Sequence, residues 1–172
     1  DPYSIVPSRD ENGHGSILAG VAAGSVVRQG NPYIGAAPDA DIVVVKLKEC
    51  KQYLRSFYLV PEGVPAYQEN DIMMGISYLM SLARQYSMPM VICLGLGTNQ
   101  GSHTGRSPLG LYMNDLSSYF GVVLVTAAGN ETGYGHHYSA SLTAGEKSRL
   151  VELNVGKDDP GFSMELWAQD VE

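Results

Sequence analysis

Three short apolar runs, separated by stretches with helical spacing, constrain the fold of this chain more than any other feature. The runs cover residues 41–47, 89–95 and 121–127, and the first and third are rich in the β-branched residue valine. Four consecutive apolar residues indicate strands that are buried on both faces, as in a parallel sheet. The order strand, helix, strand, helix, strand therefore predicts an α/β fold with crossover helices between parallel strands.

Three segments have the sequence signals of helices that could pack against such a sheet. Residues 67–87 are the clearest, because apolar side chains recur there at steps of three and four. Residues 12–27 show the same spacing, and residues 107–119 begin with Ser107 as a candidate N-cap followed by Pro108 in the first turn. We therefore expect helices on the faces of the sheet.

The end of the chain has a different pattern. Residues 145–172 alternate loosely between apolar and polar side chains and are divided by the turn sequence KDDPG, residues 157–161. This pattern predicts two antiparallel strands. We therefore expect an α/β unit over residues 1–144 and the beginning of a separate β-rich domain from residue 145.

Charge and composition exclude several classes of partner. The chain has 11 basic and 18 acidic side chains, a formal net charge of -7, which argues against nucleic acid and anionic membranes. No apolar stretch is long enough to cross a bilayer. Cys50 and Cys93 form neither a metal-binding spacing nor a disulfide framework, so no metal or other cofactor is indicated. Cys93 lies in the run MVICL and is expected to be buried.

One histidine has the surroundings of a catalytic base. His14 stands between two glycines at the start of a predicted helix, in the sequence DENGHGSILAGVAAGS. The glycines remove side chains that would crowd the ring, and loops at the ends of strands are where α/β sheets build their sites. A general base must be fixed within hydrogen-bond reach of its proton. A lone histidine is nevertheless more often structural, so a structural role is the alternative for His14 by itself.

A second candidate site follows the third predicted strand. The run VVLVTAAGN ends in Gly129 and Asn130, and the side-chain amide of Asn130 could donate hydrogen bonds into a cleft at the carboxyl end of the sheet. Glycine and asparagine are also ordinary turn residues, so a simple turn is the alternative. The adjacent histidines His136 and His137 lack a set of accompanying ligands, and a solvated loop is favoured there over a metal site.

Four blocks in one order resemble the subtilisin-like serine proteases. These are NGHGSILAGVAAG, GAAPDADIVVVKL, VICLGLGTNQGS and VVLVTAAGNETG, which are similar to the histidine block, the following strand, the substrate-binding strand and the oxyanion block. The sequences ENDIMMGISYL, GLGTNQGSHTG and GFSMELW resemble most the germination-related Csp subtilases of clostridia and other gut Firmicutes. In that branch a jelly-roll domain interrupts the protease domain after the oxyanion block, which would account for the β-rich end.

The resemblance implies a role for each matched residue. His14 would be the general base and Asn130 the oxyanion donor of a serine endopeptidase that acts on a protein or peptide. The strand Gly95, Leu96 and Gly97 would pair with the substrate backbone, and Ala128 and Gly129 would lie at the opposite wall. These residues should converge on one cleft, with the side chains of His14 and Asn130 within roughly 10 Å of each other. Ser16 stands where the family usually has threonine.

Two of the family's catalytic motifs have no match in this chain. The sequence contains neither Asp-Thr-Gly or Asp-Ser-Gly before the histidine nor Gly-Thr-Ser-Met-Ala, and Asp10 lies in loop-like sequence that matches nothing. We therefore expect a middle segment of a longer bacterial protein, spore-associated or secreted, that is inactive alone. The alternative is a pseudoprotease that binds or signals in germination. A weaker alternative is a nucleotide-binding domain, from the glycines of GLGTNQG.

The missing aspartate strand has a physical consequence. In the family this strand lies inside the sheet, so its absence leaves unpaired strand edges, and the run DIVVVKL would make such an edge prone to association. We expect one of two outcomes. Either the remaining strands close on each other and displace the His14 helix, or a second copy of the chain supplies the pairing by strand exchange.

Overall fold

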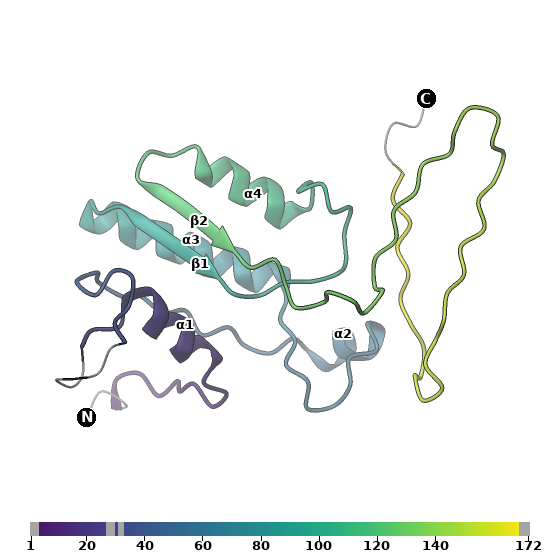
Figure 1. The fold of residues 1–172 in the computed structure, drawn as a ribbon. Helices are drawn as coiled ribbons and strands as arrows, with labels where there is room; N and C mark the ends of the chain where they lie inside the picture. Colours follow the sequence, from purple (N-terminus) through teal and green to yellow (C-terminus); the bar gives the residue numbers. More distant parts are fainter. Residues whose placement is uncertain (1–3, 27–29, 31–32, 169–172) are drawn as a thin grey trace.

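A two-stranded parallel sheet with helices on one face forms the ordered centre of the molecule (Figure 1). The computed structural model describes residues 4–26, 30 and 33–168. Within these residues the elements are α1 (His14–Ala23), α2 (Gln52–Phe57), α3 (Glu69–Tyr86), β1 (Met90–Leu94), α4 (Pro108–Ser117) and β2 (Val122–Thr126). The predicted bounds of α3, α4, β1 and β2 are confirmed to within two residues, whereas α2 was not predicted.

Parallel pairing of β1 and β2 confirms the predicted α/β fold. Met90 lies opposite Val122, and Leu94 lies opposite Thr126. The helices α3 and α4 pack on the same face of this sheet, where the buried core consists of Ile76, Met80, Ile92 and Leu116. Ser107 caps α4 as predicted, because its hydroxyl accepts a hydrogen bond from the backbone N–H of Gly110 at 3.0 Å.

The other face of the sheet is open, which corrects the expectation that the strands are buried on both faces. Along β1, Val91 and Cys93 are exposed while Ile92 between them is buried. Val123 and Val125 are exposed in the same way on β2. Cys93 is therefore not a buried residue, and it is Cys50 that is buried. Successive side chains of a strand point to opposite faces, and helices in the described residues cover only one of them.

The predicted strand at residues 41–47 is wrong. These residues belong to no strand, although part of the segment packs on α3: a Cβ added to Gly75 would lie 3.1 Å from Val45 Cγ1. Two ties hold the segment in place, since the ammonium group of Lys46 donates to the carbonyl of Arg9 and Lys48 forms an ion pair with Asp71. A strand requires a hydrogen-bonded neighbour, and no ladder joins this segment to β1 within the described part of the chain.

Helix α1 is shorter than the predicted helix over residues 12–27, of which residue 27 lies outside the described residues. It ends at Ala23 because the chain folds back there: the N–H of Gly35 donates to the carbonyl of Gly24 at 2.7 Å, and the N–H of Ala36 donates to Val21 at 3.0 Å. A Cβ on Gly35 would lie 2.3 Å from the backbone nitrogen of Gly24. Only glycine allows the returning segment to approach the helix end this closely.

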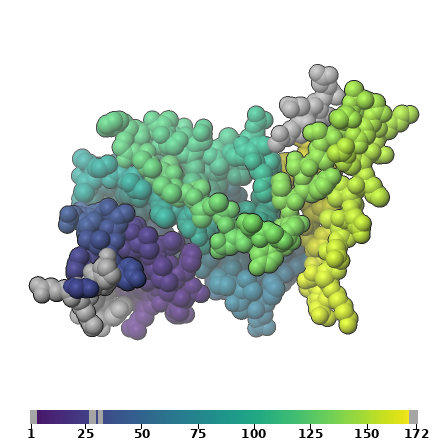
Figure 2. Space-filling model, in the orientation of Figure 1, coloured from purple at the N-terminus to yellow at the C-terminus, as the bar shows by residue number. Residues whose placement is uncertain are grey.

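The end of the chain forms a turn but not the two predicted antiparallel strands. Residues 145–168 contain no strand, and residues 169–172 lie outside the description. A turn is present at the start of KDDPG, because the N–H of Asp159 donates to the carbonyl of Gly156, the residue before this sequence, at 3.1 Å. Figure 2 shows this tail as a column along one side of the molecule. An isolated hairpin is at best marginally stable, and most side chains here are exposed, so nothing secures a ladder.

The molecule exposes far more surface than a compact domain of its size. Its accessible surface is 14535 Å², whereas a folded monomer of 18.5 kDa has about 8,200 Å². Every side chain in the part of the chain that the structure describes is at least 2% exposed. Among the described residues, none of the helices is both long and apolar enough to cross a membrane. The described fold therefore leaves apolar surface that a further polypeptide surface could cover.

Candidate functional site

His14 is the first residue of α1, and its side chain is exposed. Its position is set by Gly13, the N-cap, which has a φ of 85° in the left-handed region that glycine tolerates best. The predicted placement of the ring at the start of a helix, with a glycine on each side, is confirmed. The imidazole is thereby presented at the end of the helix rather than against its flank.

The carboxylate of Asp10 holds the beginning of this helix. It accepts hydrogen bonds from the Ser16 hydroxyl at 2.7 Å and from the backbone N–H groups of Gly13 and Ser16, both at 2.8 Å. These bonds, the one to the Ser16 hydroxyl first, hold the pKa of Asp10 down at about 2. A negative charge at a helix N-terminus also suits the helix dipole. Asp10 therefore positions the segment that carries His14.

Replacing Ser16 by alanine is expected to raise the pKa of Asp10 from about 2 toward its ordinary value of 3.8, because the largest cause of the lowering is removed. Replacing Ser16 by threonine keeps the hydroxyl and should leave the titration unchanged. The measurement is the carboxyl carbon chemical shift of Asp10 against pH. An unchanged midpoint in Ser16→Ala would contradict the assigned hydrogen bond.

The hydrogen bonds of Asp10 also determine how the stability of α1 depends on pH in acid. The folded chain favours the Asp10 carboxylate, so the stability that this carboxylate contributes is fully present above its ordinary pKa of 3.8. That contribution is lost as the pH falls through the folded pKa of about 2. We therefore expect acid to loosen the start of α1 between these two values.

The structure brings His14 and Gly95 together. A Cβ on Gly95 would lie 3.5 Å from Cε1 of His14 and 2.4 Å from Cδ1 of Leu18. Gly95 directly follows β1, so the first turns of α1 rest against the end of that strand. A side chain at position 95 would push α1 away. Nothing lies within 4 Å of a Cβ on Gly97, so the continuation of this segment borders open space.

The segments with the remaining candidate residues leave the sheet at the same edge. Leu94 and Thr126 are paired at the ends of β1 and β2, so Gly95 begins one departing segment and residues 127–130 form the other. Neighbouring strands are about 4.8 Å apart. Gly129 has a φ of 86°, and Asn130 is exposed. No hydrogen bond in the described residues joins Asn130 to His14, so the approach of their side chains stays a prediction.

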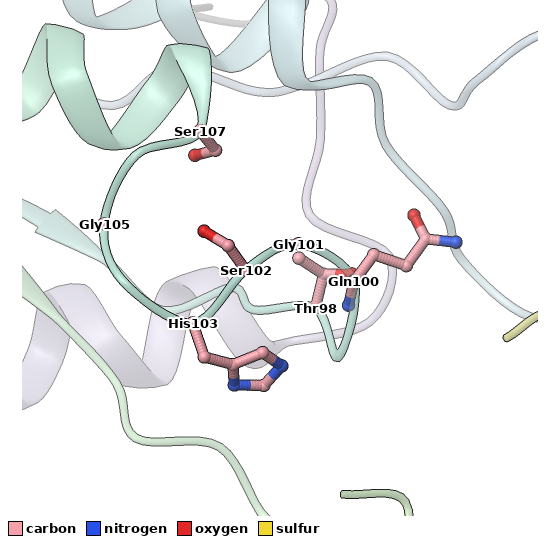
Figure 3. Close-up of a pocket in the computed structure, with 7 residues that line it drawn as sticks. All are labelled: Thr98, Gln100, Gly101, Ser102, His103, Gly105 and Ser107. Atoms are coloured by element: carbon pink, nitrogen blue, oxygen red, sulfur yellow. The ribbon is translucent and has the colours of Figure 1, made fainter. Parts of the chain in front are cut away.

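A polar loop, residues 98–107, connects the end of this edge to α4. It surrounds a small pocket lined by Thr98, Gln100, Gly101, Ser102, His103, Gly105 and Ser107 (Figure 3). The hydroxyl of Ser102 points across the pocket toward Ser107, whereas the ring of His103 points to the other side. The loop therefore extends the candidate substrate segment Gly95–Gly97 with a wall of hydroxyl and amide groups.

Two of the remaining histidines meet this loop from another segment. The ring of His137 lies 4.8 Å from that of His103, centroid to centroid, and Nδ1 of His136 is 3.3 Å from the side-chain nitrogen of Asn99. His136 is also 2.8 Å from a carboxylate oxygen of Glu131. Over the described part of the chain, no three His, Cys, Asp or Glu side chains are arranged to hold a metal ion.

Comparison with known proteins identifies the family. A sequence model of the subtilase family matches residues 1–155. The chain belongs to the subtilase family. Among solved structures it is similar to the CspB protease of Clostridium perfringens, with a TM-score of 0.63 and 33% sequence identity. The match covers 76% of this chain and 26% of that protein, so this subtilase chain spans about a quarter of its relative's length. Its fold is an incomplete subtilisin-like α/β fold.

Sequence reasoning missed two residues that shape the candidate site of this subtilase chain. Asp10 was set aside as loop sequence, although an Asp shortly before a glycine and a helix is a recognisable helix-start signal. Glu165 accepts a hydrogen bond from the backbone N–H of Gly101 at 2.7 Å. No local pattern could have revealed this second contact, because the two residues are 64 positions apart.

Proposed function

We propose that this chain is part of a serine endopeptidase that hydrolyses peptide bonds in a protein substrate. His14 acts as the general base, and the side-chain amide of Asn130 donates to the oxyanion. Gly95–Gly97 pair with the substrate backbone, and Ala128 and Gly129 form the opposite wall. Membership of the subtilase family supports this assignment, as does the similarity to a structure described as a protease.

The observation that carries the proposal is the position of the His14 ring against Gly95. A base beside the first residue of the candidate substrate segment can reach a nucleophile that attacks a carbonyl held on that segment. The absence of a side chain on Gly95 and Gly97 leaves the backbone free to pair with an extended peptide, and the open space at Gly97 leaves room for it.

The decisive experiment uses a protein that contains this chain together with a serine nucleophile and its orienting aspartate. Wild type should cleave a panel of peptides, and His14→Ala should lose several orders of magnitude in kcat. Asn130→Ala should lose about 10²–10³, a value measured in a subtilisin and transferred here. Asn114→Ala, a substitution on α4, is the matched control and should retain activity.

Three results are distinguishable in that experiment. Loss of cleavage in His14→Ala with activity retained in Asn114→Ala supports the assignment. Equal activity of His14→Ala and wild type contradicts it. Peptide binding without cleavage in the wild type replaces it with the alternative function, a pseudoprotease that binds or signals. The 172-residue chain alone, without the Asp-Thr-Gly and Gly-Thr-Ser motifs, should show no cleavage that serine-protease inhibitors block.

The proposal also covers the partner, the self-association, the domain bounds and the biological role of this chain. The partner is a protein or peptide, and the isolated chain associates with further copies by strand exchange at the free edges of its sheet. Residues 1–144 belong to the protease unit, and residues from 145 onward belong to a β-rich insertion. The similarity to a clostridial Csp protease supports a bacterial protein with a role in spore germination.

A further inference from the structure

The tail contacts the loop beside the candidate substrate segment. Oε2 of Glu165 accepts a hydrogen bond from the N–H of Gly101 at 2.7 Å and another from Nε1 of Trp167 at 3.0 Å. Gly101 lies in the 98–107 loop, which starts directly after Gly97. One carboxylate therefore joins a segment beyond residue 160 to the loop that extends the substrate segment.

Most bonds of this loop are made within it. The N–H of Gln100 donates to the Thr98 hydroxyl at 3.1 Å, and the hydroxyls of Ser102 and Thr104 are 2.7 Å apart. Nε2 of His103 lies 3.0 Å from the carbonyl oxygen of Asn99. Such short-range bonds shape the loop but do not fix its position relative to the sheet. The position of the loop is fixed by its contacts with Glu165 and with the residues around His136.

Gly101 is well suited to this contact. Its φ is 97°, a conformation that side chains rarely adopt, and nothing lies within 4 Å of where its Cβ would be. The turn thereby exposes a backbone N–H that has a carboxylate as its partner. A hydrogen bond to an ionised acceptor is shorter and stronger than one between neutral groups.

We propose that Glu165 is a positioning residue for the pocket in the 98–107 loop, beside the candidate substrate segment, and that through Glu165 the tail sets the conformation of this loop. This rests on the proposed peptidase function and deepens it, because it makes the shape of the pocket wall depend on a segment outside the α/β unit. Release of the Glu165 carboxylate frees Gly101 and widens the pocket, so substrate binding weakens while the chemical step at His14 is little affected.

The electrostatics of the contact agree with this role. The hydrogen bonds from Gly101 and then Trp167 hold the pKa of the Glu165 carboxyl below its usual range, and the nearby ring of His103 acts in the same direction. The ring of His137 lies beside that of His103, tilted from it by 42° with the centroids 4.8 Å apart, so it is a second titratable group at this contact. The carboxylate is therefore the form that binds the loop, and protonation in acid releases it.

The test uses the 172-residue chain and reads the contact directly. Trp167 is the only tryptophan in the sequence, so its fluorescence reports on the residue that shares the Glu165 carboxylate. The variants are Glu165→Gln, which keeps an acceptor without charge, and Glu165→Ala, which removes it. Glu152→Gln is the matched control, an exposed glutamate of the same tail. Hydrogen exchange of the Gly101 amide is followed by NMR in all four proteins.

We expect Gly101 protection to fall by roughly tenfold in Glu165→Ala and by less in Glu165→Gln. The wild type and Glu152→Gln should keep it, and their Trp167 emission should titrate with a midpoint below the ordinary glutamate pKa of 4.5. That transition should vanish in Glu165→Gln. Equal Gly101 protection in all four proteins, or a Trp167 titration that survives in Glu165→Gln, would overturn the inference.

A second readout separates this inference from the proposed function. In a protein that contains this chain and the missing catalytic residues, Glu165→Gln should raise KM several-fold and leave kcat nearly unchanged. A fall in kcat at constant KM would count against a positioning role. The exchange and fluorescence readouts need no catalysis, so they remain decisive even if His14 proves not to be a base.

Discussion

Replacing Ile76 by alanine is expected to destabilise the chain by about 2–5 kcal/mol. Ile76 is 3% exposed and lies at the centre of the buried core between α3, α4 and the sheet. That core contains four buried side chains among the described residues, each 3–5% exposed, so few neighbours can close the cavity. The loss is a large part of the 5–15 kcal/mol that stabilises an ordinary domain. Denaturant unfolding followed by circular dichroism measures it.

Met74→Ala is the matched control for this experiment. Met74 lies on the same helix but is 70% exposed, so its truncation creates no cavity and should change the free energy of unfolding by less than about 0.5 kcal/mol. Similar midpoints for the two variants would show that the α3 face assigned to the core is wrong. A loss of cooperativity in Ile76→Ala alone would still support it, because the core would then no longer unfold as one unit.

The second large effect is association. We expect the isolated chain to form dimers or larger species at micromolar concentration, because Val91, Val123 and Val125 cover an open sheet face and both edges of the β1–β2 sheet lack partners within the described residues. Size-exclusion chromatography with light scattering measures the mass directly. Introducing a charge by Val123→Lys should shift the population toward the monomer, since a lysine ammonium cannot be buried without a partner.

Leu111→Lys provides the comparison for Val123→Lys. Leu111 is also exposed but belongs to α4, on the covered side of the sheet, so its substitution should leave the mass distribution unchanged. A monodisperse monomer of 18.5 kDa at all concentrations would refute the association. An equal shift in both variants would assign the contact to general surface charge rather than to the open sheet face.

Local patterns predicted the central elements well. The helical periodicity of residues 67–87 corresponds to α3, and the Ser107 and Pro108 start signal corresponds to α4. The apolar runs at residues 89–95 and 121–127 correspond to β1 and β2. These elements pack directly on one another, so their sequences carry the signals of their own burial. The run at residues 41–47 has the same composition, yet it forms no strand, because a strand also depends on a neighbour that its own sequence does not encode.

The burial of β1 on one face only and the long-range contacts could not be predicted, for a related reason. An apolar run such as MVICL looks the same whether helices cover one face of the strand or both, so the exposure of Cys93 could not be foreseen. His14 was recognisable from its neighbours, and its contact with Gly95 follows from the fold. The bonds of Asp10 to Ser16 and of Glu165 to Gly101 start from carboxylates outside the helices and strands, where no periodicity marks them.

The close approach of Gly35 to the end of α1 means that both ends of this helix are fixed by contacts with other segments. Asp10 accepts hydrogen bonds from the first turn, and the backbone of the returning segment donates hydrogen bonds to the last turn. The ten residues of the helix between these contacts span about 15 Å. A helix is stiff along its axis, so a displacement of its last turn also moves its first turn. A bulky residue at position 35 would therefore displace the helix and with it the His14 imidazole at the opposite end, although position 35 lies far from that ring in the sequence.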